Sequence, residues 1–205
     1  MVSIINDRIL YVESQKEPIA SDSYIIKGHN STWIYDVSSS DDAYREIEAI
    51  EGKKNIVISH FHPDHLGNIS RINLDEATLY VSKQTYKYSN LGNIVDENIT
   101  IDDGQKFRIF RLPSSHAKGC LGLEVGNEFA FVGDAIYPMQ KDNHKVYNIQ
   151  LLKEQIEIIE GLNANKIFIS HAKKPFVRQE VVVAFLKKVY AKRSSDSNFI
   201  FERLF

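Results

Sequence analysis

The sequence predicts a mixed α/β fold in which helices pack outside mixed β-structure. Three short segments rich in β-branched and aromatic residues, at 8–13, 23–27 and 31–37, are joined by short polar links, which favours an antiparallel meander. A helix over 42–51 and a strand at 56–58 follow the third segment. Because a strand, a helix and a second strand in succession are typical of a sheet covered by helices, we expect a mixed sheet with helices outside it.

Local signals define the helix over 42–51 and the strand that follows it. The polar stretch 38–41 offers several N-caps, and Gly52 ends the helix. The β-branched run at 56–58 indicates a buried strand. The apolar face of the helix is formed by Tyr44, Ile47 and Ile50.

The second half of the chain repeats this alternation. A strand at 78–82 and a short helix at 83–89 precede strands at 98–101 and 107–112, and a hairpin turns at Gly126 and Asn127. The remaining expected elements are a polar loop at 137–147, a helix at 148–161, a strand at 166–170, a helix at 178–192 and an apolar tail at 199–205. The last helix is expected to bury Val182, Phe185, Leu186 and Val189.

Composition limits the class of protein. With 205 residues, of which 43% are hydrophobic, the chain fits one domain over 1–205 with a sizeable core. A net charge of −2 gives no general case for binding nucleic acid or membranes. The sequence shows no signal peptide or membrane span, and its one cysteine, Cys120, excludes an internal disulfide. We therefore expect a soluble, cytoplasmic protein of one domain, whose partner is neither a nucleic acid nor a membrane.

The densest group of potential metal ligands follows the strand at 56–58. His60 and His62 lie two residues apart in an extended segment, so their side chains point to the same side and can bind one cation. Pro63 stops the strand. The alternative is a surface loop that happens to contain histidines, but so many histidine and aspartate side chains together favour metal binding.

The side chains of the next two residues, Asp64 and His65, are expected to point away from His60 and His62. Asp64 suits the N-cap of a helix over 66–72, and His65 would lie in its first turn. The change from strand to helix turns both side chains away from the first pair of histidines. One stretch therefore provides ligands for two adjoining metal sites.

The same arrangement recurs along the chain. A short apolar strand ends in a histidine or aspartate at His60, His116, Asp134 and His171. Any one of these, taken alone, is more often an ordinary loop residue. Strand ends that converge at one sheet edge would form a rigid group of ligands, which a tightly bound cation requires.

With these motifs in this order, the sequence resembles the metallo-β-lactamase superfamily, and within it the small glyoxalase-II-like hydrolases. The resemblance covers residues 8–192 and includes the defining H-x-H-x-D-H motif at 60–65. The other matching motifs are Tyr35-Asp36, His116-Ala117-Lys118-Gly119, Gly133-Asp134 and Ser170-His171. The resemblance implies a four-layer αβ/βα sandwich, with two mixed β-sheets face to face, helices on both outer faces and the site at one edge.

The resemblance also implies a role for each motif residue. The first metal would be bound by His60, His62 and His116. The second would be bound by Asp64, His65 and His171. Asp134 would bridge the two metals. Asp36 would accept a hydrogen bond that orients a ligand histidine, although it can also be a plain turn aspartate after a strand.

Some features depart from the family pattern. Ser115 stands where a glycine is usual before the third-motif histidine, and Cys120 stands where a serine is more usual. Cys120 is either a buried packing residue or a thiol near the metals. The C-terminal helical domain of glyoxalase II and the inserted domain of the nucleic-acid-processing branch are both missing, so neither activity is expected.

The ligand set predicts a zinc-dependent hydrolase. All seven ligands are nitrogen or oxygen donors, which suits two Zn²⁺ ions per chain, with Mn²⁺ or Fe²⁺ also possible. The two ions would share a hydroxide that attacks a thioester, lactone or phosphodiester. Asp64 is the expected catalytic residue, which orients the nucleophile or relays its proton.

Candidate substrate contacts come from the loops. The 137–147 loop would flank the pocket, and its candidates are Tyr137, Lys141, His144 and Tyr147. Lys118 and Lys173 each lie two residues after a predicted ligand and would bind an anionic group, unless they are solvated surface charges. His29 lies in a predicted turn and is expected to be solvated.

Two other functions are compatible with the same residues. One is a mononuclear iron enzyme similar to the persulfide dioxygenases, which also have Gly-Cys after the third motif, as in Gly119-Cys120 here. The other is a non-catalytic metal-binding regulatory protein. The apolar tail at 199–205 would pack either on its own core or on a second copy, which makes a homodimer possible.

Overall fold

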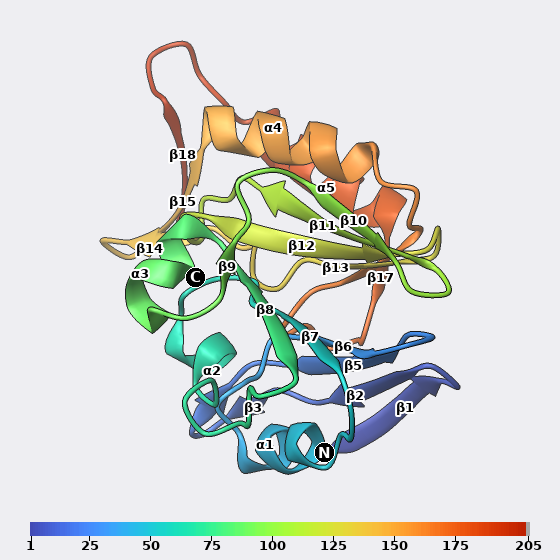
Figure 1. The fold of residues 1–205 in the computed structure, drawn as a ribbon. Helices are drawn as coiled ribbons and strands as arrows, with labels where there is room; N and C mark the ends of the chain where they lie inside the picture. The colour runs from blue at the N-terminus through green and yellow to red at the C-terminus, as the bar shows by residue number, and fades with distance from the viewer. Residues whose placement is uncertain (204–205) are drawn as a thin grey trace.

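The computed structural model describes residues 1–203 and shows two β-sheets that face each other between layers of helices (Figure 1). The first sheet contains, in spatial order, β1 (Val2–Asn6), β2 (Ile9–Val12), β5 (Ser23–Lys27), β6 (Thr32–Tyr35), β7 (Lys54–Val57), β8 (Ala77–Val81) and β9 (Asn93–Ile94). The second contains β10 (Ile99–Asp102), β11 (Lys106–Leu112), β12 (Cys120–Val125), β13 (Phe129–Phe131), β16 (Lys166–Phe168) and β17 (Val177–Arg178).

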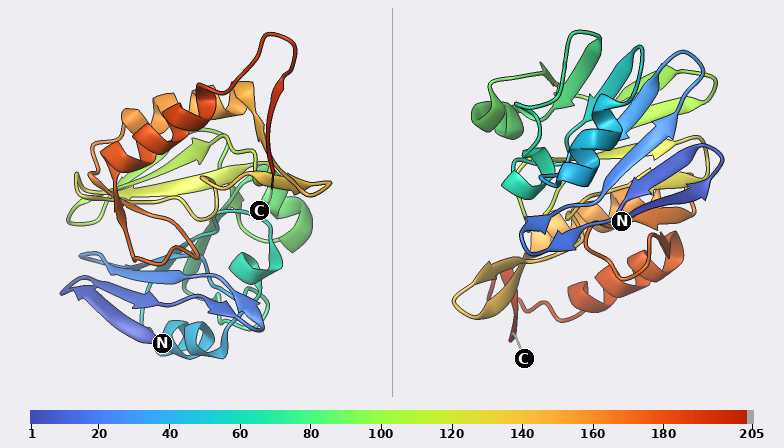
Figure 2. Two further views of the ribbon diagram at one scale, coloured as in Figure 1. Left: turned by 180° about the vertical axis from the view of Figure 1, so that it is seen from behind. Right: turned by 90° about the horizontal axis from the view of Figure 1, so that it is seen from below.

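Both sheets mix parallel and antiparallel pairs. In the first, β6, β7, β8 and β9 run parallel, while β1, β2, β5 and β6 pair antiparallel. In the second, only β13 and β16 are parallel. The helix α1 (Asp41–Glu48) covers the outer face of the first sheet, and α4 (Ile149–Glu160) and α5 (Gln179–Tyr190) cover that of the second (Figures 1 and 2). The predicted four-layer sandwich is therefore confirmed.

Side-chain alternation along the strands builds these layers. Trp33 and Tyr35 of β6 point into the core between the sheets, whereas Ile34 points outward and packs with Ile47 of α1. The Trp33 ring stacks on Phe107 of the second sheet with 4.3 Å between ring centroids. Strands that are apolar on both faces require cover on both sides, which explains the outer helices.

The helices begin where the sequence provides caps. The side chain of Ser40 accepts a hydrogen bond from the backbone N–H of Ala43 at the start of α1. The side chain of Asn148 accepts one from Leu151 at the start of α4. Both bonds satisfy N–H groups that have no partner within the helix. Among the described helices, none has both the length and the apolar character needed to cross a bilayer.

The helix predicted over 66–72 is much shorter in the structure. It is the single turn α2 (Pro63–Leu66), with His62 rather than Asp64 at the N-cap. The helix does not continue because its next hydrogen bond is not available: the carbonyl of Asp64 accepts from Ser21, and the N–H of Asn68 donates to Ser38. Tertiary contacts thus outcompete the local helical pattern. The short helix α3 (Lys83–Ser89) lies at the same end of the molecule (Figure 1).

The predicted polar loop at 137–147 is instead part of a small third sheet. The strands β14 (Met139–Lys141) and β15 (His144–Asn148) form a hairpin, and β18 (Phe199–Arg203) pairs with β15 (Figure 2). The hairpin turns at Asp142 and Asn143, both with positive φ, so this pair was a turn signal in the sequence. β1 and the ribbon of β3 (Gln15–Lys16) and β4 (Ile19–Ala20) were also not predicted.

The apolar tail packs partly on its own chain. Ile200 is buried, whereas Phe199 and Phe201 of β18 are exposed. Leu204 and Phe205 lie outside the described residues, and the homodimer remains a prediction. Phe185, expected in the buried face of α5, is 47% exposed because it faces a cavity instead of the core.

Candidate metal centre

The predicted ligands gather at the edge of the sandwich where α2 lies (Figure 1). Asp36 and His60 follow β6 and β7 of the first sheet. His116, Asp134 and His171 follow β11, β13 and β16 of the second sheet. Both sheets therefore contribute, and the centre lies across the end of the sandwich and not along one sheet edge.

Three histidines form the first cluster. Nδ1 of His62 lies 2.9 Å from Nε2 of His60 and 3.1 Å from Nε2 of His116. Burial lowers the pKa of all three side chains, which are therefore neutral. Neutral imidazoles whose ring nitrogens converge in this way are the donor set of a transition-metal ion, so this cluster fits a cation.

Two carboxylates and two histidines form the second cluster, Asp64, His65, Asp134 and His171. Nε2 of His171 lies 3.0 Å from Oδ2 of Asp64. Nε2 of His65 and Oδ1 of Asp134 are buried without a hydrogen-bond partner in the described part of the chain. Because buried polar atoms are normally paired, these two atoms also fit a cation ligand set.

Asp134 joins the two clusters. Its Oδ2 lies 3.4 Å from Nε2 of His116 in the first cluster. The same oxygen lies 3.5 Å from Nε2 of His65 and 3.9 Å from Nε2 of His171 in the second. A single carboxylate within reach of both groups is placed to bridge two cations.

Asp36 orients His65 by contacting the ring nitrogen that faces away from the second cluster. Its Oδ2 lies 2.7 Å from Nδ1 of His65, and its Oδ1 accepts a 2.6 Å hydrogen bond from the backbone N–H of Ser59. Burial lowers the pKa of His65, but the negative charges of Asp36 and Asp134, with the hydrogen bond to Asp36, outweigh it and raise this pKa to about 10. With Nδ1 bound to Asp36, Nε2 of His65 faces the second cluster.

Three further residues support the ligands, and the sequence interpretation missed them. The hydroxyl of Ser59 lies 2.9 Å from Nδ1 of His60. The hydroxyl of Ser114 accepts from the N–H of His116 and donates to the carbonyl of Ala135, so it ties two ligand loops together. Oδ2 of Asp22 accepts a hydrogen bond from the backbone N–H of His171. A small polar residue directly before or near each ligand was the available signal for the serines, whereas Asp22 had none.

A cavity of about 710 Å³ opens onto the centre and is lined by His62, His116, Asp134 and His171. Tyr137 and Tyr147 also line it, and burial raises the pKa of both phenols to about 12. The hydroxyl of Tyr137 donates a 2.8 Å hydrogen bond to the carbonyl of Ser170.

The other candidate contacts lie elsewhere. Lys141 and Lys173 are exposed and do not line this cavity. His144 contacts the carbonyl of Asp142, and Lys118 lines neighbouring cavities. His29 is exposed, as expected for a turn residue.

The two departures from the family pattern have structural roles. The hydroxyl of Ser115 accepts a 2.9 Å hydrogen bond from the N–H of Asn148, which links the third-motif loop to the start of α4. Cys120 is buried in the core, and burial raises the pKa of its thiol to about 12. Its Sγ lies 3.3 Å from the carbonyl of Ala117. Cys120 thus packs as a small apolar residue with a protonated thiol.

Comparison with known proteins identifies the fold. No protein-family model matches the chain, and no curated protein matches its sequence. Among solved structures, a stereoselective inverting sec-alkylsulfatase from Pseudomonas sp. superposes with a TM-score of 0.71 at 11% identity, over 93% of this chain and 41% of the sulfatase. An archaeal metallo-β-lactamase superfamily protein from Sulfolobus tokodaii gives a TM-score of 0.62 at 18% identity, over 88% of this chain and 85% of the other.

A third similar structure contains a diiron centre. The chemotaxis sensor ODP, with a peroxy diiron species, gives a TM-score of 0.67 at 15% identity, over 93% of this chain and 94% of the sensor. The chain spans less than half of the sulfatase but nearly all of the other two proteins. At these identities, the comparisons show that the chain has the metallo-β-lactamase fold, as the resemblance implied, and they do not select one chemistry.

Proposed function

We propose that this chain is a dinuclear metal-dependent hydrolase that cleaves an ester-type bond in a small molecule. The observation that supports this most directly is the position of Asp134, whose Oδ2 lies 3.4 Å from His116 in one cluster and 3.5 Å from His65 in the other. A shared carboxylate between two complete clusters is what a dinuclear centre requires.

The first cation would be bound by His60, His62 and His116, and the second by Asp64, His65 and His171, with Asp134 between them. The seven donors are nitrogen and oxygen atoms, which favours Zn²⁺, with Mn²⁺ or Fe²⁺ also suited. When bound, the two cations would supply Lewis acidity and a water that ionises near neutral pH. The centre is partly shielded from water, because His60 and His65 are buried, whereas His116 and His171 are partly exposed to the cavity.

Asp64 is the residue that we expect to handle the proton. Burial raises its pKa, but the hydrogen bond with His171 and the charge on His65 hold that pKa below the ordinary value. Asp64 is therefore an ionised carboxylate, which can orient a nucleophile or accept its proton. Tyr137 lines the same cavity and would contact the substrate through its ring, because its hydroxyl is already bonded to Ser170.

A mononuclear iron enzyme on this fold fits the structure less well. The second cluster is complete, so nothing in the ligand set favours a single metal. The thiol of Cys120, the feature shared with persulfide dioxygenases, is buried and protonated. A diiron redox centre would bind to the same histidine and carboxylate ligands. Measuring which metal the protein contains distinguishes such a centre from a zinc or manganese hydrolase.

Elemental analysis of protein purified without affinity metals or chelators is the first experiment, followed by assays with thioester, lactone and phosphodiester substrates. We expect about two zinc or manganese ions per chain and a hydrolysis rate that His116→Ala abolishes. The control is His29→Ala, which removes an exposed histidine. Iron as the main metal, with oxygen consumption and no hydrolysis, would replace the hydrolase by a redox enzyme. No metal after reconstitution would exclude both.

A further inference from the structure

Two further cavities follow in sequence from the one at the metal centre, each sharing lining residues with the one before it. The first of these, which we call the apolar cavity, has a volume of about 1010 Å³ and shares His116 and Met139 with the metal-centre cavity. Its apolar lining includes Phe61, Leu112, Val146, Leu151 and Ile158. The apolar cavity therefore lies beside the metal centre, and His116 lines both.

The third cavity, which we call the basic cavity, has a volume of about 410 Å³ and adjoins the apolar cavity at Arg111 and Lys118. Its charged lining consists of Lys83, Lys87, Arg111, Lys118 and one carboxylate, Asp96. Within residues 1–203, none of its four cations forms an ion pair with a carboxylate. On a chain with a net charge of −2, four cations beside one carboxylate form a local excess of positive charge.

The four cationic side chains are exposed, and the backbone brings the segments that carry them close together. The segments 82–87 and 118–121 form two walls of the basic cavity. They approach closely at Gly119, where an added Cβ would meet Oγ of Ser82 at 2.8 Å. Arg111 is held on one side, because its Nη1 donates a 3.3 Å hydrogen bond to the carbonyl of Asp96. The rest of its guanidinium is free to bind an anion.

The charges in the neighbouring cavity direct an anion to this position. The apolar cavity has three carboxylates in its lining, Asp96, Glu97 and Glu154, against the two cations that it shares with the basic cavity, so its charges do not favour a negative group. The basic cavity, with four cations against one carboxylate, favours a group with more than one negative charge. Arginine in particular matches the geometry of phosphate oxygens.

We propose that the substrate has an apolar middle and a phosphate group at the end remote from the scissile bond, and that the basic cavity binds this phosphate. The proposal rests on the proposed function, because it places the scissile bond at the metal centre. It defines the substrate class as phosphorylated ester-type molecules.

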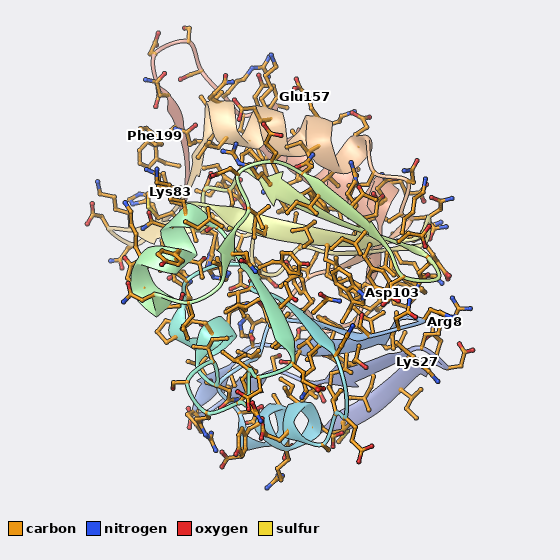
Figure 3. The ribbon with its side chains drawn as sticks, in the orientation of Figure 1. Arg8, Lys27, Lys83, Asp103, Glu157 and Phe199 are labelled. Carbon is orange, nitrogen blue, oxygen red and sulfur yellow. The ribbon has the colours of Figure 1, made fainter. Side chains whose placement is uncertain are left out.

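The first test is independent of hydrolysis. Inorganic phosphate is titrated into the zinc-loaded protein, and backbone amide signals are followed by NMR. We expect shifts at residues 82–87 and 118–121, and a dissociation constant at least tenfold weaker in the Lys83→Ala/Lys87→Ala double variant. The control is Arg8→Ala/Lys27→Ala, which removes two exposed cations at the opposite end of the molecule from Lys83 (Figure 3). Shifts confined to the metal ligands, or equal affinity in the double variant, would overturn the proposal.

The second test uses a matched pair of thioesters that differ only in a terminal phosphate or hydroxyl group. We expect the wild-type ratio of kcat/KM, phosphate over hydroxyl, to fall at least tenfold in the double variant and in Lys118→Ala, which alters the other wall. The Arg8→Ala/Lys27→Ala control should retain the wild-type ratio. An unchanged ratio in the cavity variants would contradict the proposal. If the wild type hydrolyses neither thioester, the proposed hydrolase function fails. The phosphate titration would still show whether the basic cavity binds an anion.

Discussion

The backbone N–H of His171 donates a 2.9 Å hydrogen bond to Oδ2 of Asp22. The N–H of Asp22 in turn donates a 3.0 Å hydrogen bond to the hydroxyl of Ser170. His171 has φ +59°, a left-handed conformation that a non-glycine residue adopts only where its surroundings hold it. Asp22, 1% exposed and directly before β5 of the first sheet, therefore fixes the backbone of the last ligand of the second cluster.

Asp22→Ala is expected to impair the second metal site. Without the carboxylate, the loop of His171 loses the contact that stabilises its strained backbone, so metal content should fall from about two ions per chain toward one. Elemental analysis after dialysis measures this. Tyr11→Phe is the matched control, because Tyr11 donates a 3.0 Å hydrogen bond to Oδ1 of Asp22, whereas His171 bonds to Oδ2. It should keep two ions and lose about 1 kcal/mol of stability. Two ions retained in Asp22→Ala would refute the positioning role.

Variants of the ligands should lose metal in a pattern that follows the clusters. His116→Ala should weaken only the first site and His171→Ala only the second, since each histidine belongs to one cluster. Asp134→Ala should weaken both, because its Oδ2 lies within 3.9 Å of histidines from both clusters. Competition with a colorimetric zinc chelator gives the two affinities. Loss of a single site in Asp134→Ala would contradict a bridging role.

Asp36→Asn tests the orientation of His65. Asparagine tolerates the left-handed backbone of residue 36, whose φ is +59°, so the substitution chiefly removes the charge. We expect affinity at the second site to fall about 10- to 100-fold, as is typical when a partner of a ligand histidine is lost. Affinity at the first site should remain within about threefold of wild type. Equal loss at both sites would point to a general disruption of the fold.

Metal removal should destabilise the protein. Ions that bind only the folded state stabilise it by about 4 kcal/mol when their free concentration is about a thousand times Kd. Dialysis against a chelator should therefore lower Tm, and added Zn²⁺ should restore it. The His60→Ala/His171→Ala double variant, with one ligand removed from each cluster, should show little response to either treatment. An unchanged Tm in the wild type would contradict metal binding at the clusters.

The metal-free protein should lose stability in mild acid. The pKa values of His60, His62 and His116 are lowered in the folded state by burial, so below about pH 6.5 the unfolded state binds more protons than the folded one. His65 acts in the opposite sense: its raised pKa contributes stability that is fully present below about pH 6.5 and is lost as pH rises through about 10.

Urea unfolding of the metal-free protein between pH 7 and pH 5 measures the acid effect. The free energy of unfolding should fall by about 1 kcal/mol or more per pH unit below pH 6.5. Substitution of His62 and His116 by asparagine should flatten this dependence, and His29→Ala should not change it. A wild-type profile that is already flat would show that the buried histidines are not neutral.

Sequence patterns and the family resemblance together predicted the residues that gather in the two clusters: four of them come shortly after short apolar strands, and the other three lie within the motif at 60–65. His60 and His62 illustrate this: their spacing in an extended segment places both ring nitrogens in one cluster, 2.9 Å apart. The local patterns predicted a mixed sheet with helices outside it, and the family resemblance implied the second sheet and the order of the four layers.

Only the tertiary structure decided the contacts between distant segments. Asp22 and His171 are 149 residues apart, and nothing in the local pattern of either indicates the other. The same holds for β18, which pairs with β15, and for α2, which ends early because the carbonyl of Asp64 is bonded to Ser21. Local periodicity determines secondary structure, whereas a hydrogen-bond partner far along the chain is determined only when the whole chain is packed.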